Sequence, residues 1–259
     1  MTPPQLGAEL AGSRQCGSFS FDHEPGLILM IRRFLLSRCV RAAAVAGGIV
    51  LSATPILAQR GAILGDVPAQ PRPGARYLIY LHGRIIEEKG PRPTDERFGT
   101  YEYQQILDSL AASGADVIAE QRPRGTDFRA FGSHVADQVR RLLAAGVPAE
   151  RIAVVGFSKG GAIAMIASAL LKDPGITFVF LGSCGDWVNG RDDVDVRGRI
   201  LSIYEASDEL GTSCEPLFAQ ASEAGEHREI RIDTGAAHGA FFLPRPEWLA
   251  PLFQWVGRH

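Results

Sequence analysis

The sequence has no excess of positive charge and very little lysine. Its 27 Lys and Arg residues are balanced by 29 Asp and Glu residues, which gives a formal net charge of −2. The only lysines are Lys89, Lys159 and Lys172, and the arginines are scattered among acidic residues. Proteins that bind nucleic acids concentrate basic residues on one surface. The composition therefore predicts no nucleic-acid partner.

Metal-ligand spacings and internal repeats are also absent from the sequence. Neither of the two cysteines beyond residue 58, Cys184 and Cys214, has a second ligand at the spacing of a zinc site. No cluster of His and Asp residues compensates for this. We expect no metal and no cofactor, and the sequence carries no signal for an oligomeric state.

A long membrane-spanning run is missing as well. The uncharged stretch 42–59 is interrupted by Gly47, Gly48 and Pro55, whereas a membrane span needs about 20 apolar residues. This stretch follows a basic segment, 30–41, and contains the small residue Ala58. Basic, apolar and small residues in that order are typical of a secretory signal peptide. An uncleaved N-terminal anchor and a chance apolar segment are the alternatives.

These features divide the chain into four segments. Residues 1–29 precede a plausible start at Met30, and we interpret them as an over-extended or disordered leader. Residues 30–58 are the predicted signal peptide, with a weak twin-arginine resemblance at its start. Residues 59–76 are rich in Pro and Gly and are predicted as a linker, and 77–259 as one domain. We expect the mature protein to be periplasmic or secreted, without stable membrane insertion.

Apolar runs alternate with amphipathic segments along the predicted domain. Strands are expected at 77–81, 116–120, 152–157, 177–181, 200–206 and 227–232. Helices are expected at 101–112, 130–145, 160–172, 215–224 and 248–256, and 84–99 as a surface loop. This alternation predicts an α/β fold, with a mostly parallel six-stranded sheet covered by helices on both faces. Ligands bind such sheets beyond the carboxyl ends of the strands.

The most informative motif is Gly-Phe-Ser-Lys-Gly at 156–160, between a predicted strand and a predicted helix. In that context the motif indicates a sharp turn that holds the Ser158 hydroxyl above the sheet, at a helix N-terminus. Glycines at 156 and 160 would let strand and helix approach closely. We predict Ser158 as a nucleophile, the alternative being a glycine-rich turn without chemistry.

A serine nucleophile needs a base, and His238 is the best candidate. It lies in Gly-Ala-Ala-His-Gly, in a loop after the last predicted strand. His227 begins that strand at the far end, His134 falls within a helix, and His259 is the terminus. His82 follows the first predicted strand, and we expect it to brace that loop by side-chain hydrogen bonds.

The base in turn needs an acid to orient it. Asp208 comes directly after a predicted strand and is the preferred candidate. Asp186, after the preceding strand, is its main rival, and Glu205 lies within the strand pattern itself. An aspartate that only initiates a turn is the alternative for Asp208. The predicted oxyanion donors are the backbone N–H groups of Lys159 and Arg84, with Gly83 as second choice to Arg84.

These motifs together resemble the α/β-hydrolase superfamily. The resemblance rests on His82-Gly83, on the motif at 156–160, and on Asp208 and His238 in the order Ser, Asp, His, and it covers roughly 76–258. It implies the fold of that family and an acyl-enzyme mechanism, as in small lidless esterases or dienelactone hydrolases. The stretch between Leu181 and Ile200 is too short for a cap domain.

The resemblance predicts a serine hydrolase that acts on small acyl compounds, with a carboxylic ester as the preferred substrate. A peptidase or amidase of the same fold and a catalytically idle binding domain are the alternatives. The loops expected around the site carry six basic residues among acids: Arg84, Arg92, Arg97, Arg122, Arg124 and Lys159. We expect solvated loops of mixed charge there, and a cationic rim for anionic acyl groups is the alternative.

The two remaining cysteines follow neighbouring predicted strands. Exported proteins commonly pair their cysteines, so we predict a disulfide between Cys184 and Cys214. Such a bond would tether the loop that carries Asp208. Two buried thiols are the alternative.

Overall fold

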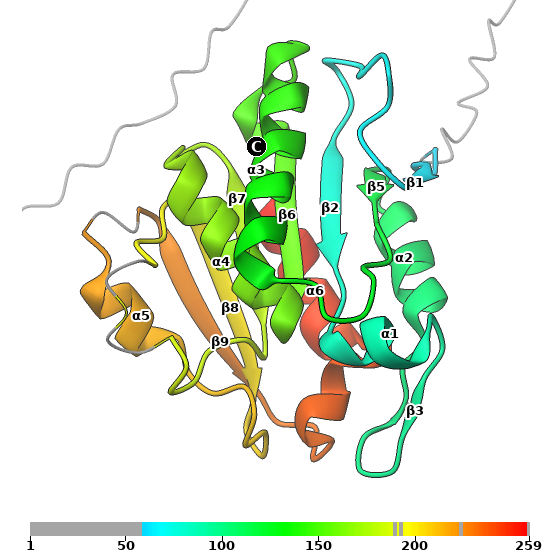
Figure 1. Ribbon diagram of the computed structural model, residues 1–259, viewed down its shortest axis with the longest axis vertical. Helices are drawn as coiled ribbons and strands as arrows, with labels where there is room; N and C mark the ends of the chain where they lie inside the picture. Colours follow the sequence, from blue (N-terminus) through cyan, green and yellow to red (C-terminus); the bar gives the residue numbers. More distant parts are fainter. Residues whose placement is uncertain (1–58, 189–190, 192–193, 223–224, 258–259) are drawn as a thin grey trace, which may run out of the picture. The chain divides into compact units, whose positions relative to one another are not determined.

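The expected apolar runs form a parallel sheet in the computed structural model, which describes residues 59–188, 191, 194–222 and 225–257 (Figure 1). The predicted leader and signal peptide, 1–29 and 30–58, lie outside the described residues. The sheet has seven strands in the order β1-β5-β2-β6-β7-β8-β9, and each neighbouring pair is parallel. Its strands are β1 (Ile63–Leu64), β2 (Tyr77–Leu81), β5 (Asp116–Ile118), β6 (Ile152–Phe157), β7 (Thr177–Leu181), β8 (Arg199–Glu205) and β9 (His227–Ile232).

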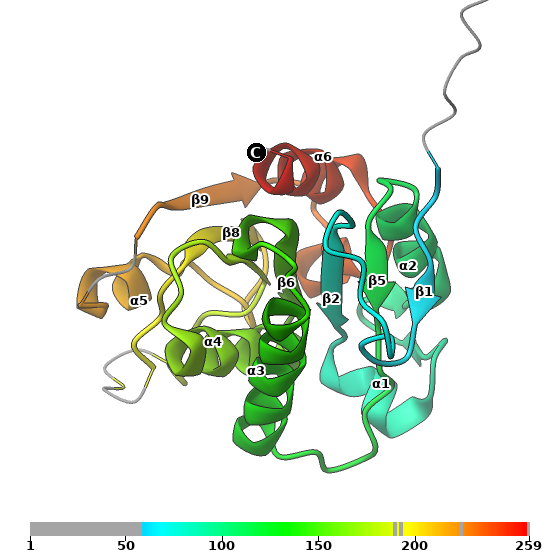
Figure 2. The ribbon, with the colours of Figure 1, turned by 90° about the horizontal axis from the view of Figure 1, so that it is seen from above.

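Helices cover both faces of this sheet (Figure 2). On one face lie α3 (Phe128–Ala144), α4 (Lys159–Leu171) and α5 (Glu215–Gln220), and on the other α2 (Tyr103–Ala111) and α6 (Pro246–Val256). Helix α1 (Arg84–Lys89) lies at the carboxyl end of the strands, and its Ile86 belongs to the core under α2 and α6. Strand β2 contains no charged residue because it is buried on both faces of the sheet. Tyr77 and Ile79 belong to the core under α3 and α4, whereas Leu78 and Tyr80 belong to the core under α2 and α6. A strand buried on both faces has no position for a solvated side chain.

The α/β prediction is therefore confirmed, and all six expected strands are present. The seventh strand, β1, is an addition, because it lies in the segment predicted as a linker. It has two residues, and Ile63 and Leu64 pair with Val117 and Ile118 of β5 at the sheet edge. A strand this short leaves no periodic pattern in a stretch rich in Pro and Gly.

The surface loop predicted at 84–99 is wrong in part. Its first six residues form α1, and its end contributes to a small antiparallel ribbon of β3 (Thr94–Asp95) and β4 (Gly99–Thr100). Short 3-10 turns occur at Ala149–Arg151 and Ala237–Phe241. Only two residues separate the end of β2 from helix α1, so the first turn of α1 lies beside the carboxyl end of the sheet.

Two further features bear on the sequence-based expectations. The described residues between β7 and β8 contain no helix, in agreement with the short stretch that predicted no cap domain there. Within the described ranges, we find no helix with the length and apolar character that crossing a bilayer would require.

Candidate active site

Ser158 lies in the sharp turn between β6 and α4, with a backbone conformation that side chains rarely adopt. Its φ is 52° and its ψ is −119°. A non-glycine residue at positive φ is strained, and such strain clusters at functional sites. The turn places Ser158 directly before α4, the helix whose N-terminal amide groups face the carboxyl end of the sheet.

The glycines on either side of Ser158 are required by close packing. A Cβ at Gly156 would lie 2.2 Å from the carbonyl oxygen of Gly160. A Cβ at Gly160 would lie 2.0 Å from the carbonyl oxygen of Leu81. Both distances are far below van der Waals contact, and both obstacles are backbone atoms. These two positions therefore need glycine for β2, β6 and α4 to meet at this turn.

Asp208 and His238 contact one another directly. Asp208 follows β8, and His238 lies in the 3-10 turn after β9, 30 residues later. The Nδ1 atom of His238 lies 2.6 Å from Oδ2 of Asp208. The backbone N–H of Leu210 donates to the other carboxylate oxygen, Oδ1, at 2.9 Å. If Nδ1 carries the proton in this pair, Nε2 is left as an acceptor, which is the tautomer that a general base requires.

The rival acids are placed differently. Asp186 is exposed in the turn after β7. Glu205 is fully buried, but its carboxylate is engaged by the backbone N–H groups of Ser207, Thr234 and Gly235, at 2.7, 2.8 and 3.0 Å. The contact with His238 is thus made by the residue that the sequence favoured.

A cavity of about 750 Å³ opens at the carboxyl end of the sheet, and both Ser158 and His238 line it. Its size falls within the range of small-molecule sites. Phe157 lies beneath the histidine, with its ring centroid 4.7 Å from that of His238. The structure therefore brings the predicted nucleophile and base to one cavity, and the predicted acid contacts the base.

The two predicted oxyanion donors also line this cavity. Lys159 is the first residue of α4, and Arg84 is the first residue of α1. Backbone N–H groups in the first turn of a helix have no partner within their own helix. Gly83, the second choice to Arg84, lines the same cavity. Two separate chain segments thus bring the predicted donor residues to the cavity that Ser158 lines.

Comparisons with known proteins point to one fold. The chain matches no protein-family model and no curated protein. Among solved structures, the HSL-homolog EstE7 from a metagenome library is similar over 75% of this chain and 83% of its own, with 17% identity and a TM-score of 0.52. The domain has the α/β-hydrolase fold.

Two other solved structures are similar at lower TM-scores. A thermostable esterase shares 19% identity over 74% of this chain, with a TM-score of 0.47, and the chain spans 57% of its length. RedJ, solved with a polyethylene glycol molecule in its active site, shares 14% identity over 80% of this chain and 98% of its own, with a TM-score of 0.47. At these identities the likeness concerns the fold alone.

Within this α/β-hydrolase fold, His82 braces the loop after β2, as the sequence predicted. Its ring is fully buried. Its Nε2 accepts the backbone N–H of Arg122 at 3.0 Å, so Nδ1 carries the proton and donates to the carbonyl oxygen of Gly83 at 2.9 Å. Burial, and then the positive charge of Arg122, lower the pKa of His82 to about 3. The ring is therefore neutral and acts as a brace rather than as a base.

A buried ion cluster beside the nucleophile was not foreseen from the sequence. The carboxylate of Glu87, on α1, accepts from Nε of Arg122 at 2.8 Å and from Nζ of Lys159 at 2.6 Å. The side chains of Glu87 and Arg122 are both 0% exposed. The sequence predicts Arg122 among the basic residues of the loops around the site, and this is wrong because its side chain is buried. No local pattern marks such a cluster, because its members are 35 and 72 residues apart in the chain.

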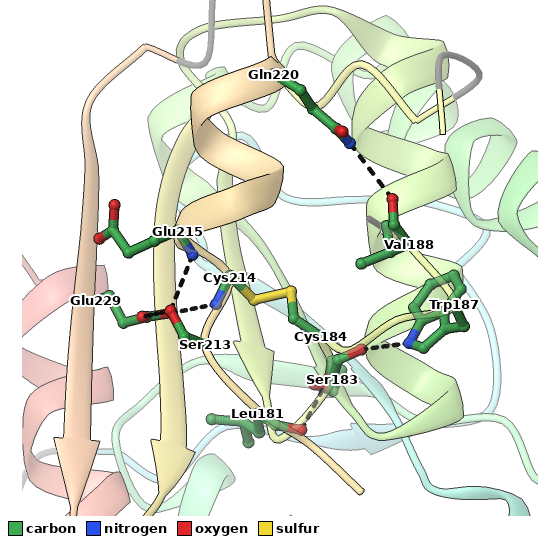
Figure 3. The surroundings of a disulfide bond; sticks show 11 residues. Leu181, Ser183, Cys184, Trp187, Val188, Ser213, Cys214, Glu215, Gln220 and Glu229 are labelled. Atoms are coloured by element: carbon green, nitrogen blue, oxygen red, sulfur yellow. Dashed lines mark hydrogen bonds between the residues drawn. A yellow bond between two sulfur atoms is a disulfide. The ribbon is translucent and has the colours of Figure 1, made fainter. Parts of the chain in front are cut away.

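A disulfide joins Cys184 and Cys214, as predicted, and closes a segment of 30 residues that contains Asp208 (Figure 3). The Cys214 end is anchored to β9, because Glu229 accepts from the Ser213 hydroxyl at 2.5 Å and from the Cys214 backbone N–H at 2.6 Å. The Cys184 end follows β7. The disulfide therefore ties the Asp208 segment to the loop after β7, and Glu229 ties the Cys214 end of that segment to β9.

Proposed function

We propose that this protein is a serine hydrolase that cleaves small acyl compounds, with a carboxylic ester as the preferred substrate. The observation that carries the proposal is the contact between Asp208 and His238 at the rim of a cavity that Ser158 also lines. A strained serine between a strand and a helix, together with an oriented imidazole, is the arrangement that acyl transfer needs. The α/β-hydrolase fold supports this and leaves the substrate open.

In the proposed reaction, Oγ of Ser158 attacks the ester carbonyl carbon and Nε2 of His238 takes the hydroxyl proton. The carbonyl oxygen becomes an oxyanion, which the backbone N–H groups of Lys159 and Arg84 bind. Asp208 stabilises the imidazolium that forms. When the carbon–oxygen bond to the leaving group breaks, the imidazolium returns the proton to the departing alcohol, and an acyl group remains on Ser158.

The second half of the reaction removes that acyl group. A water molecule attacks the acyl carbon while Nε2 of His238 takes one of its protons. The bond to Oγ of Ser158 then breaks, and the serine recovers its proton from the imidazolium. The products are a carboxylic acid and the free enzyme. The same groups thus act twice, and each step conserves protons.

Hydrolysis of short-chain esters by three proteins tests the proposal: the wild type, Ser158→Ala and Asp208→Asn. Removing a member of a serine triad lowers kcat by a factor of about 10⁴ or more. We expect both variants to lose activity to that extent while they unfold at the wild-type temperature. An anilide of the same acyl group distinguishes an amidase. A folded wild type without activity on either substrate would support the binding-domain alternative instead.

We also propose that the protein is exported after cleavage near Ala58. The support is the disulfide, because such bonds persist in oxidising compartments. N-terminal sequencing of protein recovered from the periplasm or medium of a bacterial host tests this. A new N-terminus close to Gln59 is the expected result, and an intact N-terminus retained in the membrane fraction would favour the anchor.

A further inference from the structure

Two pairs of aromatic side chains line the cavity. Phe128 and Trp187 pack edge to face, with ring centroids 6.1 Å apart and an interplanar angle of 80°. Phe98 and Phe242 form a similar pair, with centroids 6.0 Å apart and an angle of 74°. Phe98 also lies 5.8 Å from the ring of His238. Large planar side chains therefore make up much of the apolar lining around the proposed base.

The two pairs belong to opposite faces of the sheet. Phe128 and Trp187 pack against the core that lies under α3 and α4. Phe242 is part of the core under α2 and α6, and Phe98 packs against that same core. The sheet separates the two cores, and the cavity lies beyond the carboxyl ends of its strands. The pairs therefore form two walls on opposite sides of the cavity, with Ser158 on the strand–helix turn between them.

The position of Trp187 is fixed by its surroundings. Its indole Nε1 donates to the backbone carbonyl of Ser183 at 3.0 Å (Figure 3). Cys184, the residue after Ser183, is held by the disulfide. Trp187 is only partly buried, and its side chain lines the cavity. The hydrogen bond to Ser183 keeps the ring in this position. A ring held in this way presents a preformed apolar surface, which lowers the entropic cost of binding a ligand.

The charged side chains that line the cavity are balanced and already paired. They are three cations and three anions: Arg84, Lys89, Lys159, Glu88, Asp95 and Asp127. Arg84 pairs with Glu88 at 3.2 Å, and Lys89 donates to the carbonyl oxygen of Thr94 at 3.4 Å.

The remaining three also have partners. Lys159 donates to Glu87 at 2.6 Å and to the carbonyl oxygen of Thr126 at 2.5 Å. Asp95 accepts the backbone N–H of Arg97, and Asp127 accepts those of Arg129 and Ala130 at the start of α3. Because three anions accompany the three cations, the lining has no excess of positive charge that would attract an anionic acyl group. This arrangement favours an uncharged substrate over the anionic one that a cationic rim would select.

We infer that the site takes uncharged esters that carry one planar aromatic ring, with the ring held between the Phe128–Trp187 wall and the Phe98–Phe242 wall. The inference rests on the proposed function and narrows its substrate class. Aromatic rings gain about 0.5–1.5 kcal/mol from one another beyond the area that they bury, which corresponds to about a two- to tenfold preference. A saturated ring of similar size gains only the buried area.

Two matched substrate pairs test the inference. Ethyl phenylacetate against ethyl cyclohexylacetate places the ring on the acyl side, and benzyl acetate against cyclohexylmethyl acetate places it on the alcohol side. Within each pair the ring is one carbon removed from the ester, so intrinsic reactivity is similar. We expect kcat/KM to favour the aromatic member about two- to tenfold in at least one pair. Equal or better hydrolysis of the cyclohexyl member in both pairs would overturn the inference.

Variants of the wall residues test whether the two walls cause the preference for the aromatic ester. Trp187→Ala and Phe98→Ala should each reduce the ratio of kcat/KM for the aromatic ester to kcat/KM for the cyclohexyl ester towards one. Trp187→Phe should keep most of this ratio. Phe253→Ala is the matched control, because Phe253 lies on α6 outside the cavity lining. An advantage that persists unchanged in both alanine variants would contradict the inference. Thermal unfolding of each variant shows that a change in the ratio does not reflect loss of the fold.

Two further measurements separate this inference from the proposed function. Monoethyl succinate should be hydrolysed more slowly than ethyl pentanoate, and the reverse order would overturn the choice of an uncharged substrate. Labelling by a fluorophosphonate is measured on the same preparation. Labelling that depends on Ser158, together with no aromatic preference, would refute the inference alone. Absence of both labelling and turnover would refute the inference together with the proposed function.

Discussion

The ammonium group of Lys159 lies 2.6 Å from a carboxylate oxygen of Glu87, whose side chain has no exposure to solvent. Lys159 follows the proposed nucleophile, and Glu87 lies three residues after Arg84 on α1. The carboxylate thus connects the two segments whose backbone amides are the proposed oxyanion donors. Its other oxygen accepts from Nε of Arg122 at 2.8 Å, so Glu87 retains an ion-pair partner when Lys159 is changed.

Replacing Lys159 by methionine should lower kcat for a short-chain ester about tenfold and leave KM within about twofold. A complete loss of one oxyanion donor costs about 10²–10³ in kcat, and loosening its position should cost less. Steady-state kinetics measures kcat and KM separately, and titration of Ser158 with a fluorophosphonate corrects kcat for any loss of active enzyme. Lys159→Arg keeps the charge and should recover most of the rate. Wild-type kcat in the methionine variant would contradict this role.

His82, which is buried and neutral in the folded protein, should make the free energy of unfolding depend on pH. The unfolded chain binds a proton at His82 below pH 6.5, whereas the folded chain does so only near pH 3. Stability therefore falls as the pH decreases through this window, by up to about 1.4 kcal/mol per pH unit from this one residue. Urea unfolding of the wild type and His82→Gln at pH 7, 6, 5 and 4 measures the difference. Parallel pH profiles for the two proteins would show that His82 does not contribute.

Glu205 should stabilise the segments that carry both Asp208 and His238. Burial tends to raise the pKa of Glu205, but hydrogen bonds from Ser207, Thr234 and Gly235 outweigh it and lower the pKa to about 2. Glu205→Gln places an NH₂ group against N–H donors and removes the charge. We expect a loss on the order of 2 kcal/mol in the free energy of unfolding at pH 7, together with a lower kcat.

The matched control for this change is Glu209→Gln. The side chain of Glu209 is 86% exposed and lies four residues further along the chain. Urea unfolding at neutral pH should show no effect of that control beyond about 0.5 kcal/mol. Equal stability of the two glutamine variants would mean that the Glu205 hydrogen bonds do not hold these loops together.

Removing the disulfide should destabilise the protein by about 3–4 kcal/mol, which is the entropic value for a closed segment of 30 residues. The double variant Cys184→Ser and Cys214→Ser is compared with the wild type in guanidinium chloride, with and without a reductant. The reductant should shift the wild-type midpoint to that of the variant and leave the variant unchanged. A wild type that is insensitive to reduction under unfolding conditions would contradict this expectation.

The sheet could be predicted because its strands are buried on both faces. The run 152–157, for example, is apolar throughout, and a segment of that kind can only be a core element. Strand β1 could not be predicted, because two residues carry no pattern and depend on pairing with β5. Helix α1 was missed for a related reason, since its only apolar residues are Ile85 and Ile86.

The sequence allowed part of the proposed site to be predicted, because that part depends on local residues. The turn at Ser158 is encoded locally by Gly156 and Gly160, so the sequence marks it directly. The ion cluster of Glu87, Arg122 and Lys159 is encoded by long-range packing, and each member alone resembles an ordinary surface charge. The aromatic walls could not be predicted for the same reason. Phe128 at the start of α3 contacts Trp187 after β7 only in the folded protein.

The most direct test of the account is the site at which a fluorophosphonate reacts. After brief labelling of the folded protein, proteolysis and mass spectrometry locate the adduct on a single peptide. The account predicts one adduct on Ser158, strong slowing of labelling in His238→Ala, and none at all in Ser158→Ala. An adduct on a different residue, or labelling of Ser158→Ala at the wild-type rate, would contradict the proposed mechanism.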